Sequence, residues 1–152
     1  MGLLHDLRST RERGFHGRLI VAILYMERVS LFKFPFKVLR SLICQMVYHC
    51  EISPESFSSG AALLSLRLPH PYLVVVHRKV LIEQDVTIFH GVTIGAREGR
   101  HQGVPRICRN AYIGTGATIL GDVSVGFGAR IGAHALVMVD VKENSTVVGV
   151  LS

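Results

Sequence analysis

Histidine is the residue type in this sequence best suited to acid–base chemistry. Among eight histidines, His70 and His90 lie in the segments LPHP (68–71) and TIFHGVTIG (87–95). An imidazole, with a pKa of about 6.5, can take a proton from an attacking hydroxyl and later return it to a leaving group. The pattern alone leaves a second interpretation open, because His70 lies six residues before Val76, in line with a series of aliphatic residues. It could equally be a buried core histidine.

The elements that must position these histidines follow a six-residue repeat. One aliphatic series consists of Val76, Ile82, Ile88, Ile94, Ile107, Ile113, Ile119, Val125, Ile131 and Val137. A second series, two residues ahead of the first, consists of Val74, Val80, Val86, Val92, Ala111, Ala117, Val123, Ala129 and Ala135. Neither a helix nor a strand has this period, whereas six is the period of the hexapeptide β-helix. We therefore expect three hexapeptides to close one triangular coil, with its aliphatic side chains inside.

The polar segment GAREGRHQGVPR (95–106) interrupts both series. We expect it to loop out of the coil, where binding residues are often found. The alternative all-β architecture, an antiparallel sandwich, would show alternating runs separated by about 8–12 residues. The sequence does not have this pattern.

The first 49 residues differ in character from the rest. They hold eight Arg and Lys against three Asp and Glu, and the patterns predict helices over 17–29 and 36–48 with a break at Phe34–Pro35. We therefore expect a basic, mostly helical segment over 1–49 and a β-helix domain over 50–152. The segment 1–49 either has a solvated basic face or contacts an anionic membrane peripherally; a nucleic-acid partner is not expected.

The spacing of the cysteines and histidines bears on the cellular compartment of the protein and on metal binding. Cys44, Cys50 and Cys108 have no CxxC spacing and cannot all pair within one chain, so we expect a reducing, cytoplasmic location and no disulfide framework. No two histidines are five residues apart, which argues against the zinc site of the γ-type carbonic anhydrases, and no metal is expected. The apolar run Leu19–Met26 is too short to span a bilayer and has no cleavage site after it.

Six motifs follow one another in a fixed order after residue 50: EISP (51–54), LPHP (68–71), DVTIFHGVTIG (85–95), IGTGATILGDVSVG (113–126), ARIGAHALV (129–137) and TVVGV (146–150). On these motifs the chain resembles the hexapeptide-repeat acyltransferases, and within them the serine acetyltransferase branch. The resemblance implies an all-β, left-handed parallel β-helix that forms a homotrimer or a dimer of trimers. It also implies acetyl transfer from acetyl-CoA to a hydroxyl, at sites between subunits.

The resemblance assigns roles to three side chains. His70 matches the general base of the family. Glu51 matches the acidic residue that orients this base, although the family usually has the shorter Asp there. His101 resembles a histidine of the serine enzymes and would contact substrate. Apart from the resemblance, His90 lies twenty residues after His70, about one coil further on, and is a second candidate for the base or for a substrate contact.

The resemblance also places the cofactor. Coenzyme A would lie against small residues at the corners of the coil, which here are Gly95, Ala96, Thr115 and Gly116. Small side chains let the pantetheine arm approach the backbone. Arg130 takes a position where Lys is common and would pair with a phosphate.

Two departures from the serine enzymes bear on the acceptor. Pro69 stands directly before His70, where those enzymes have an acidic residue for the amino group of serine, and only 49 residues precede the coils. In both respects the chain looks more like the acetyltransferases of exopolysaccharide clusters of the colanic-acid kind. We therefore predict an acetyl-CoA-dependent O-acetyltransferase acting on a saccharide hydroxyl. A serine O-acetyltransferase of cysteine biosynthesis and a non-catalytic β-helix scaffold remain the alternatives.

Overall fold

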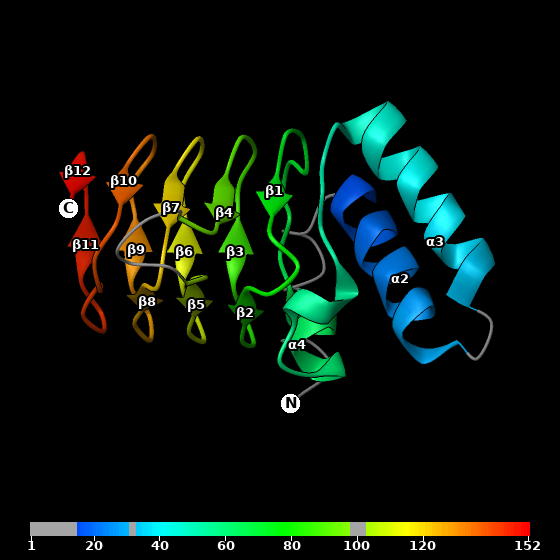
Figure 1. Cartoon of the computed structure of the whole chain (residues 1–152), viewed down its shortest axis with the longest axis horizontal. Helices are drawn as coiled ribbons and strands as arrows, with labels where there is room; N and C mark the ends of the chain where they lie inside the picture. Colours follow the sequence, from blue (N-terminus) through cyan, green and yellow to red (C-terminus); the bar gives the residue numbers. More distant parts are fainter. Residues whose placement is uncertain (1–14, 31–32, 98–102) are drawn as a thin grey trace.

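The protein is a stack of short parallel strands with helices packed across its N-terminal end (Figure 1). The computed structural model describes residues 15–30, 33–97 and 103–152. The helices lie at one end of the stack and the C-terminal strand lies at the other (Figure 1).

The described chain begins with helices. They are α2 (Phe15–Val29), α3 (Lys33–Ser41) and the π-helix η1 (Leu42–Tyr48), and two shorter helical segments, η2 (Pro54–Ser56) and α4 (Gly60–Ser65), lie within the first coil. The second predicted helix begins at Lys33, so the predicted break at Phe34–Pro35 is wrong. Pro35 is tolerated because it lies in the first turn, where its missing N–H would have no partner within the helix.

Strands of two or three residues build the coils. They are β1 (Val75–Val76), β2 (Leu81–Ile82), β3 (Thr87–Ile88), β4 (Thr93–Gly95), β5 (Arg106–Ile107), β6 (Tyr112–Ile113), β7 (Thr118–Leu120), β8 (Ser124–Val125), β9 (Arg130–Ile131), β10 (Leu136–Val137), β11 (Thr146–Val147) and β12 (Val150–Leu151). The order is β1-β4-β7-β10-β12 in sheet A, β2-β5-β8 in sheet B and β3-β6-β9-β11 in sheet C. These three parallel sheets are the sides of a triangular prism.

The register follows the six-residue repeat. Ile107 lies beside Val125, eighteen positions further on. Ile82 lies beside Ile107, 25 positions further on, because the segment between β4 and β5 adds seven residues to that coil. An antiparallel bridge between Arg97 and Gly103 joins the two ends of this segment. The architecture is therefore the parallel β-helix that the repeat predicts.

Both aliphatic series form the core of the prism. Every member of the two series has at most 3% of its surface exposed, and burying one Val or Ile side chain is worth roughly 1.5–3 kcal/mol. Gly114 shows why glycine follows the series at a corner. A Cβ there would lie 2.8 Å from the carbonyl oxygen of Ile131 and 2.9 Å from the nitrogen of Ala133, so successive coils could not approach as closely.

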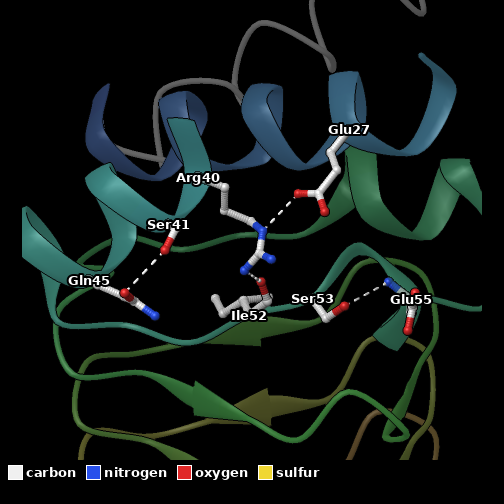
Figure 2. Close-up of polar contacts among 7 residues, drawn as sticks. All are labelled: Glu27, Arg40, Ser41, Gln45, Ile52, Ser53 and Glu55. Atoms are coloured by element: carbon white, nitrogen blue, oxygen red, sulfur yellow. Dashed lines mark hydrogen bonds and ion pairs between the residues drawn. The ribbon is translucent and has the colours of Figure 1, made fainter. Parts of the chain in front are cut away.

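Polar contacts tie the helices to the first coil. Arg40 of α3 donates from Nε to Glu27 of α2 over 2.7 Å and from Nη1 to the carbonyl of Ile52 over 3.2 Å (Figure 2). Arg28 donates to the carbonyls of Pro54 and Phe57 over 2.9 and 3.1 Å. These bonds satisfy backbone acceptors at the start of the β-helix and hold α2 and α3 against its end.

Candidate active site

One edge of the prism, between sheets C and A, carries His70, His90 and His134 on three of four stacked turns. We name this corner series the histidine edge; it consists of residues 68–74, 89–92, 114–117 and 132–135. Backbone hydrogen bonds stack its turns. The N–H of Gly91 donates to Tyr72 over 2.9 Å, that of Gly116 to His90 over 2.9 Å, and that of His134 to Thr115 over 2.8 Å.

The ring of His70 lies outside the core. Arg67 pairs with Thr87, so Leu68 takes the buried position opposite Ile88, and Leu68 is fully buried. His70 is exposed on the histidine edge. The interpretation of His70 as a core histidine is therefore wrong.

The corner that holds His70 is longer than the corners above it. Six positions separate Leu68 from Val74, the next residue of the buried series, whereas four separate Ile113 from Ala117. The corner still ends as the shorter ones do, with a left-handed residue directly before the buried one: φ is 56° at Leu73, 69° at Gly91 and 67° at Gly116. A longer, proline-flanked corner carries the imidazole outward, where a substrate can reach it.

His90 lies next to His70 on this edge. Their ring centroids are 6.1 Å apart at an interplanar angle of 72°, and the ring of Phe89 is 6.5 Å from that of His70. The structure thus brings together the base and one substrate-contact residue that the sequence predicts. An exposed imidazole pair can move a proton and hold a polar acceptor.

Glu51 lies on the outer side of sheet A. Its backbone pairs with Val75 by donating to the carbonyl of Val74 over 2.8 Å and accepting from the N–H of Val76 over 2.7 Å. Its side chain is exposed, and no hydrogen bond or ion pair joins it to His70 in the part of the chain that the structure describes. The orienting role of Glu51 stays a prediction.

The predicted cofactor residues lie on different sides of the prism. Gly95 and Ala96, at the end of β4, line a hollow of about 450 Å³ on sheet A. Thr115 and Gly116 belong to the histidine edge. Arg130 extends from sheet C, and its guanidinium lies 4.3 Å from the centre of the Tyr112 ring. A single chain therefore does not gather the five into one pocket, and their roles stay predictions.

Two further predictions concern the substrate contact of His101 and metal binding. His101 lies outside the described residues. Within the described ranges, no group of three or more His, Cys, Asp or Glu side chains is arranged to hold a metal ion.

An aromatic cluster beside the histidine edge was not predicted. The hydroxyl of Tyr48 and Nδ1 of His16 are hydrogen-bonded over 2.6 Å, and the rings of Tyr48 and Tyr72 are 5.4 Å apart. Burial raises the pKa of the Tyr48 phenol. His16 and Tyr48 precede the six-residue repeat, so no spacing in the sequence relates them to Tyr72, two positions after His70.

Known proteins resemble the chain in sequence. No protein-family profile matches it. A serine acetyltransferase of Buchnera aphidicola (subsp. Acyrthosiphon pisum, strain APS) is 38% identical over 108 residues, which cover 68% of this chain and 37% of that protein. A serine acetyltransferase of Helicobacter pylori strain J99 is 34% identical over 139 residues, which cover 90% of this chain and 77% of that protein. WcaB of Escherichia coli K12, an acetyltransferase named for colanic acid biosynthesis, is 34% identical over 122 residues. These cover 79% of this chain and 72% of that protein.

Solved structures resemble it as well. Serine acetyltransferase of Brucella abortus strain S19, in complex with coenzyme A, superposes with a TM-score of 0.71 and 30% identity over 92% of this chain and 54% of that one. Soybean serine acetyltransferase complexed with serine superposes with a TM-score of 0.74 and 29% identity over 97% of this chain and 64% of that one. The β-helix is thus of the left-handed kind. The chain spans 37–39% of the length of four serine acetyltransferases that it matches.

Proposed function

Because the chain belongs to the serine acetyltransferase family of hexapeptide-repeat acyltransferases, we propose that it transfers an acetyl group from acetyl-CoA to the hydroxyl of serine. The sequence analysis ranked a saccharide acceptor first, but the comparisons favour serine. Relatives named serine acetyltransferase include one covered over 77% of its length, and a structure that matches 97% of this chain is complexed with serine. The observation that carries the proposal is the exposed imidazole of His70 beside His90 on the histidine edge.

The chemistry needs a base because an alcohol is a weak nucleophile at neutral pH. His70 accepts the hydroxyl proton as the oxygen attacks the thioester carbonyl, and a tetrahedral intermediate forms. The C–S bond then breaks, and the imidazolium returns the proton to the leaving thiolate. A positioned base of this kind is worth about 10²–10⁴ in rate.

His90 acts as the second polar group of the site. Its ring is 6.1 Å from that of His70, which leaves space for an acceptor hydroxyl near both imidazoles. His90 therefore contacts the acceptor, while proton transfer belongs to His70.

Acetyl-CoA is the second substrate, which is consistent with the coenzyme A complex of the Brucella enzyme. The small residues Gly95, Ala96, Thr115 and Gly116 let its pantetheine arm approach the backbone, and Arg130 can pair with a phosphate. These residues lie on different sides of one prism. The proposed assembly is therefore a homotrimer in which a neighbouring subunit completes each site.

A saccharide hydroxyl is the second candidate acceptor, because Pro69 directly before His70 supplies no charge to the ammonium group of serine. A hydrogen bond to a charged group is worth about 1.5–3 kcal/mol, or roughly a 10- to 150-fold change in affinity. The similarity to WcaB extends over 72% of that protein's length, and WcaB is named for colanic acid biosynthesis.

The test measures CoA release with L-serine and, separately, with nucleotide sugars and oligosaccharides. Turnover of L-serine at ordinary rates, about 1–10³ s⁻¹, is expected. Turnover of a saccharide alone would replace serine by the second candidate. If neither acceptor is used and calorimetry detects no CoA binding, the chain is a scaffold.

A substitution sharpens the choice of acceptor. Pro69→Asp introduces the missing carboxylate and should raise kcat/KM for L-serine by tenfold or more. N-acetylserine, which has no ammonium group, is the matched control and should gain nothing. Equal effects on both acceptors would show that the ammonium group does not lie beside position 69.

A further inference from the structure

Within the described residues, the helices farthest from the C-terminus carry an apolar surface that no other segment covers. α3 and η1 follow each other directly along the chain, and α3 lies on the outer side of α2 (Figure 1). We name six of their side chains the outer stripe. Its members and exposed fractions are Phe34 79%, Val38 43%, Leu39 43%, Leu42 52%, Met46 72% and Val47 58%.

The spacing of the outer stripe places it on one side of the helical segment. Phe34, Val38 and Leu42 are four residues apart and so share a face. On the other side, Cys44 and Tyr48 are buried in the protein core. The fold is therefore stabilised through the inner side alone, and the apolar residues of the outer side have no partner in the chain described here. Uncovered apolar patches of this kind mark interaction surfaces.

The charge around the outer stripe narrows the choice of partner. Residues 15–55 contain five basic side chains and three acids, and the acids Glu27, Glu51 and Glu55 line one hollow together with Lys37 and Arg40. The helical end therefore keeps a net positive charge. The charge of Glu27 is paired, because its carboxylate accepts from Arg40 over 2.7 Å (Figure 2). Lys37 and Arg18 are exposed. The helical end is thus cationic as well as apolar.

A cationic surface with exposed Phe, Leu, Met and Val side chains is complementary to an anionic lipid surface. Lys and Arg are attracted to the headgroups, and the apolar side chains enter the boundary with the acyl chains. A second copy of the chain would bring the same positive charge to this face, so charge disfavours self-association through it. No helix in the described ranges is long and apolar enough to cross a bilayer.

We propose that the outer stripe inserts into an anionic lipid surface and holds the protein there peripherally. Bound in this way, α3 and η1 lie in the interface, and the β-helix extends away from it. The attachment depends on both apolar contact and charge. It therefore weakens with rising salt, because ions screen the attraction beyond about 8–10 Å near physiological ionic strength.

The sequence offers a direct probe because the chain has no tryptophan. Phe34→Trp places a single indole in the outer stripe, and Val148→Trp places one at a position that is 75% exposed on the coils. Vesicles of phosphatidylglycerol and phosphatidylethanolamine should shift the emission of Phe34→Trp to shorter wavelength and leave Val148→Trp unchanged. Phosphatidylcholine vesicles should shift neither.

A loss-of-binding experiment complements the probe. The double variant Phe34→Gln/Met46→Gln should bind anionic vesicles at least tenfold more weakly than the wild type in cosedimentation, with an unchanged Tm. Val148→Gln is the control and should bind like the wild type.

Three results would overturn the proposal. The wild type could fail to bind anionic vesicles, or it could bind phosphatidylcholine equally well. The double variant could instead dissociate an oligomer in sedimentation with no change in lipid binding, which would make a second copy the occupant. The Trp probe in the otherwise intact chain decides the matter if the double variant does not fold.

Discussion

Replacing Gly17 by alanine tests how α2 packs against the corner that carries His70. Gly17 lies in the first turns of α2, against the backbone of Leu68. A Cβ at position 17 would lie 3.0 Å from the carbonyl carbon and 3.1 Å from the Cβ of Leu68, and closer still to the carbonyl oxygen. Backbone cannot move aside as the end of a flexible side chain can, so α2 or the corner must shift.

Two opposing effects decide whether Gly17→Ala raises or lowers the free energy of unfolding. Alanine is favoured over glycine inside a helix by about 1 kcal/mol. Overpacking costs about 1–3 kcal/mol, and a clash with backbone atoms belongs to the upper part of that range, about 2–3 kcal/mol. The Gly17→Ala protein should therefore be less stable by about 1–2 kcal/mol. At about 2–4 °C per kcal/mol for a chain of this size, the Tm should fall by about 2–8 °C. The kcat/KM should fall as well, because Leu68 anchors the turn of His70.

Gly60→Ala is the matched control for this experiment. Gly60 is the first residue of α4, and a Cβ there would meet only Cε2 of Tyr25, at 3.7 Å. This variant should be as stable as the wild type or more stable, by up to about 1 kcal/mol. Differential scanning calorimetry and urea unfolding measure both proteins. A Gly17→Ala protein that is as stable as the wild type would refute the packing argument.

Three further substitutions test other parts of the structure. Ile113→Ala should cost about 2–5 kcal/mol in urea unfolding, whereas Val148→Ala, at an exposed site, should change stability by less than about 0.5 kcal/mol; equal effects would contradict the assignment of the core. Arg106 donates to Glu83 over 2.7 and 3.1 Å and holds the pKa of that carboxyl below its usual range. The ion pair therefore stabilises the fold above the ordinary pKa of a glutamate, and this stabilisation is lost as the pH falls through the lowered pKa. Glu83→Gln should lower the Tm at pH 7 but not at pH 2. A difference in Tm that does not change with pH would exclude this ion pair. Leu73→Asn should raise the Tm slightly, because asparagine tolerates the left-handed backbone at position 73 (φ 56°) better than leucine does; a lower Tm would show that the exposed Leu73 side chain contributes more than the strain costs.

The fold was predictable because the β-helix repeats a simple packing requirement. Each six-residue unit must place its aliphatic residues inside the prism, so residues such as Ile113 and Ile131 recur eighteen positions apart and stack. The repeat does not determine handedness, because both senses of winding bury the same residues; handedness came from the family resemblance and agrees with the related structures.

The surroundings of His70 were less predictable from spacing. A strict count of six from Val76 puts His70 in the core, but the corner is two residues longer and Leu68 is buried instead. The length of a corner changes which residue points inward without leaving a clear pattern in the sequence. The cluster of His16, Tyr48 and Tyr72 was unpredictable for another reason, since the packing of α2 and η1 on the first coil brings these rings together.

The candidate site was only partly predictable from the sequence. The motif LPHP and the repeat together relate His70 to His90 across one coil. No such relation exists for Gly95, Thr115 and Arg130, whose proposed shared role depends on how the subunits of the proposed trimer pack. A repeat within one chain contains no information on which of its sides faces another copy.

The rate of acetyl transfer by a His70→Asn protein tests the central claim most directly. Asparagine keeps a polar side chain of similar size at an exposed corner but cannot accept the hydroxyl proton. We predict an unchanged Tm, unchanged CoA binding by calorimetry, and a kcat that is about 10²–10⁴-fold lower than that of the wild type. A kcat within twofold of the wild type, with binding intact, would contradict the assignment of His70 as the base.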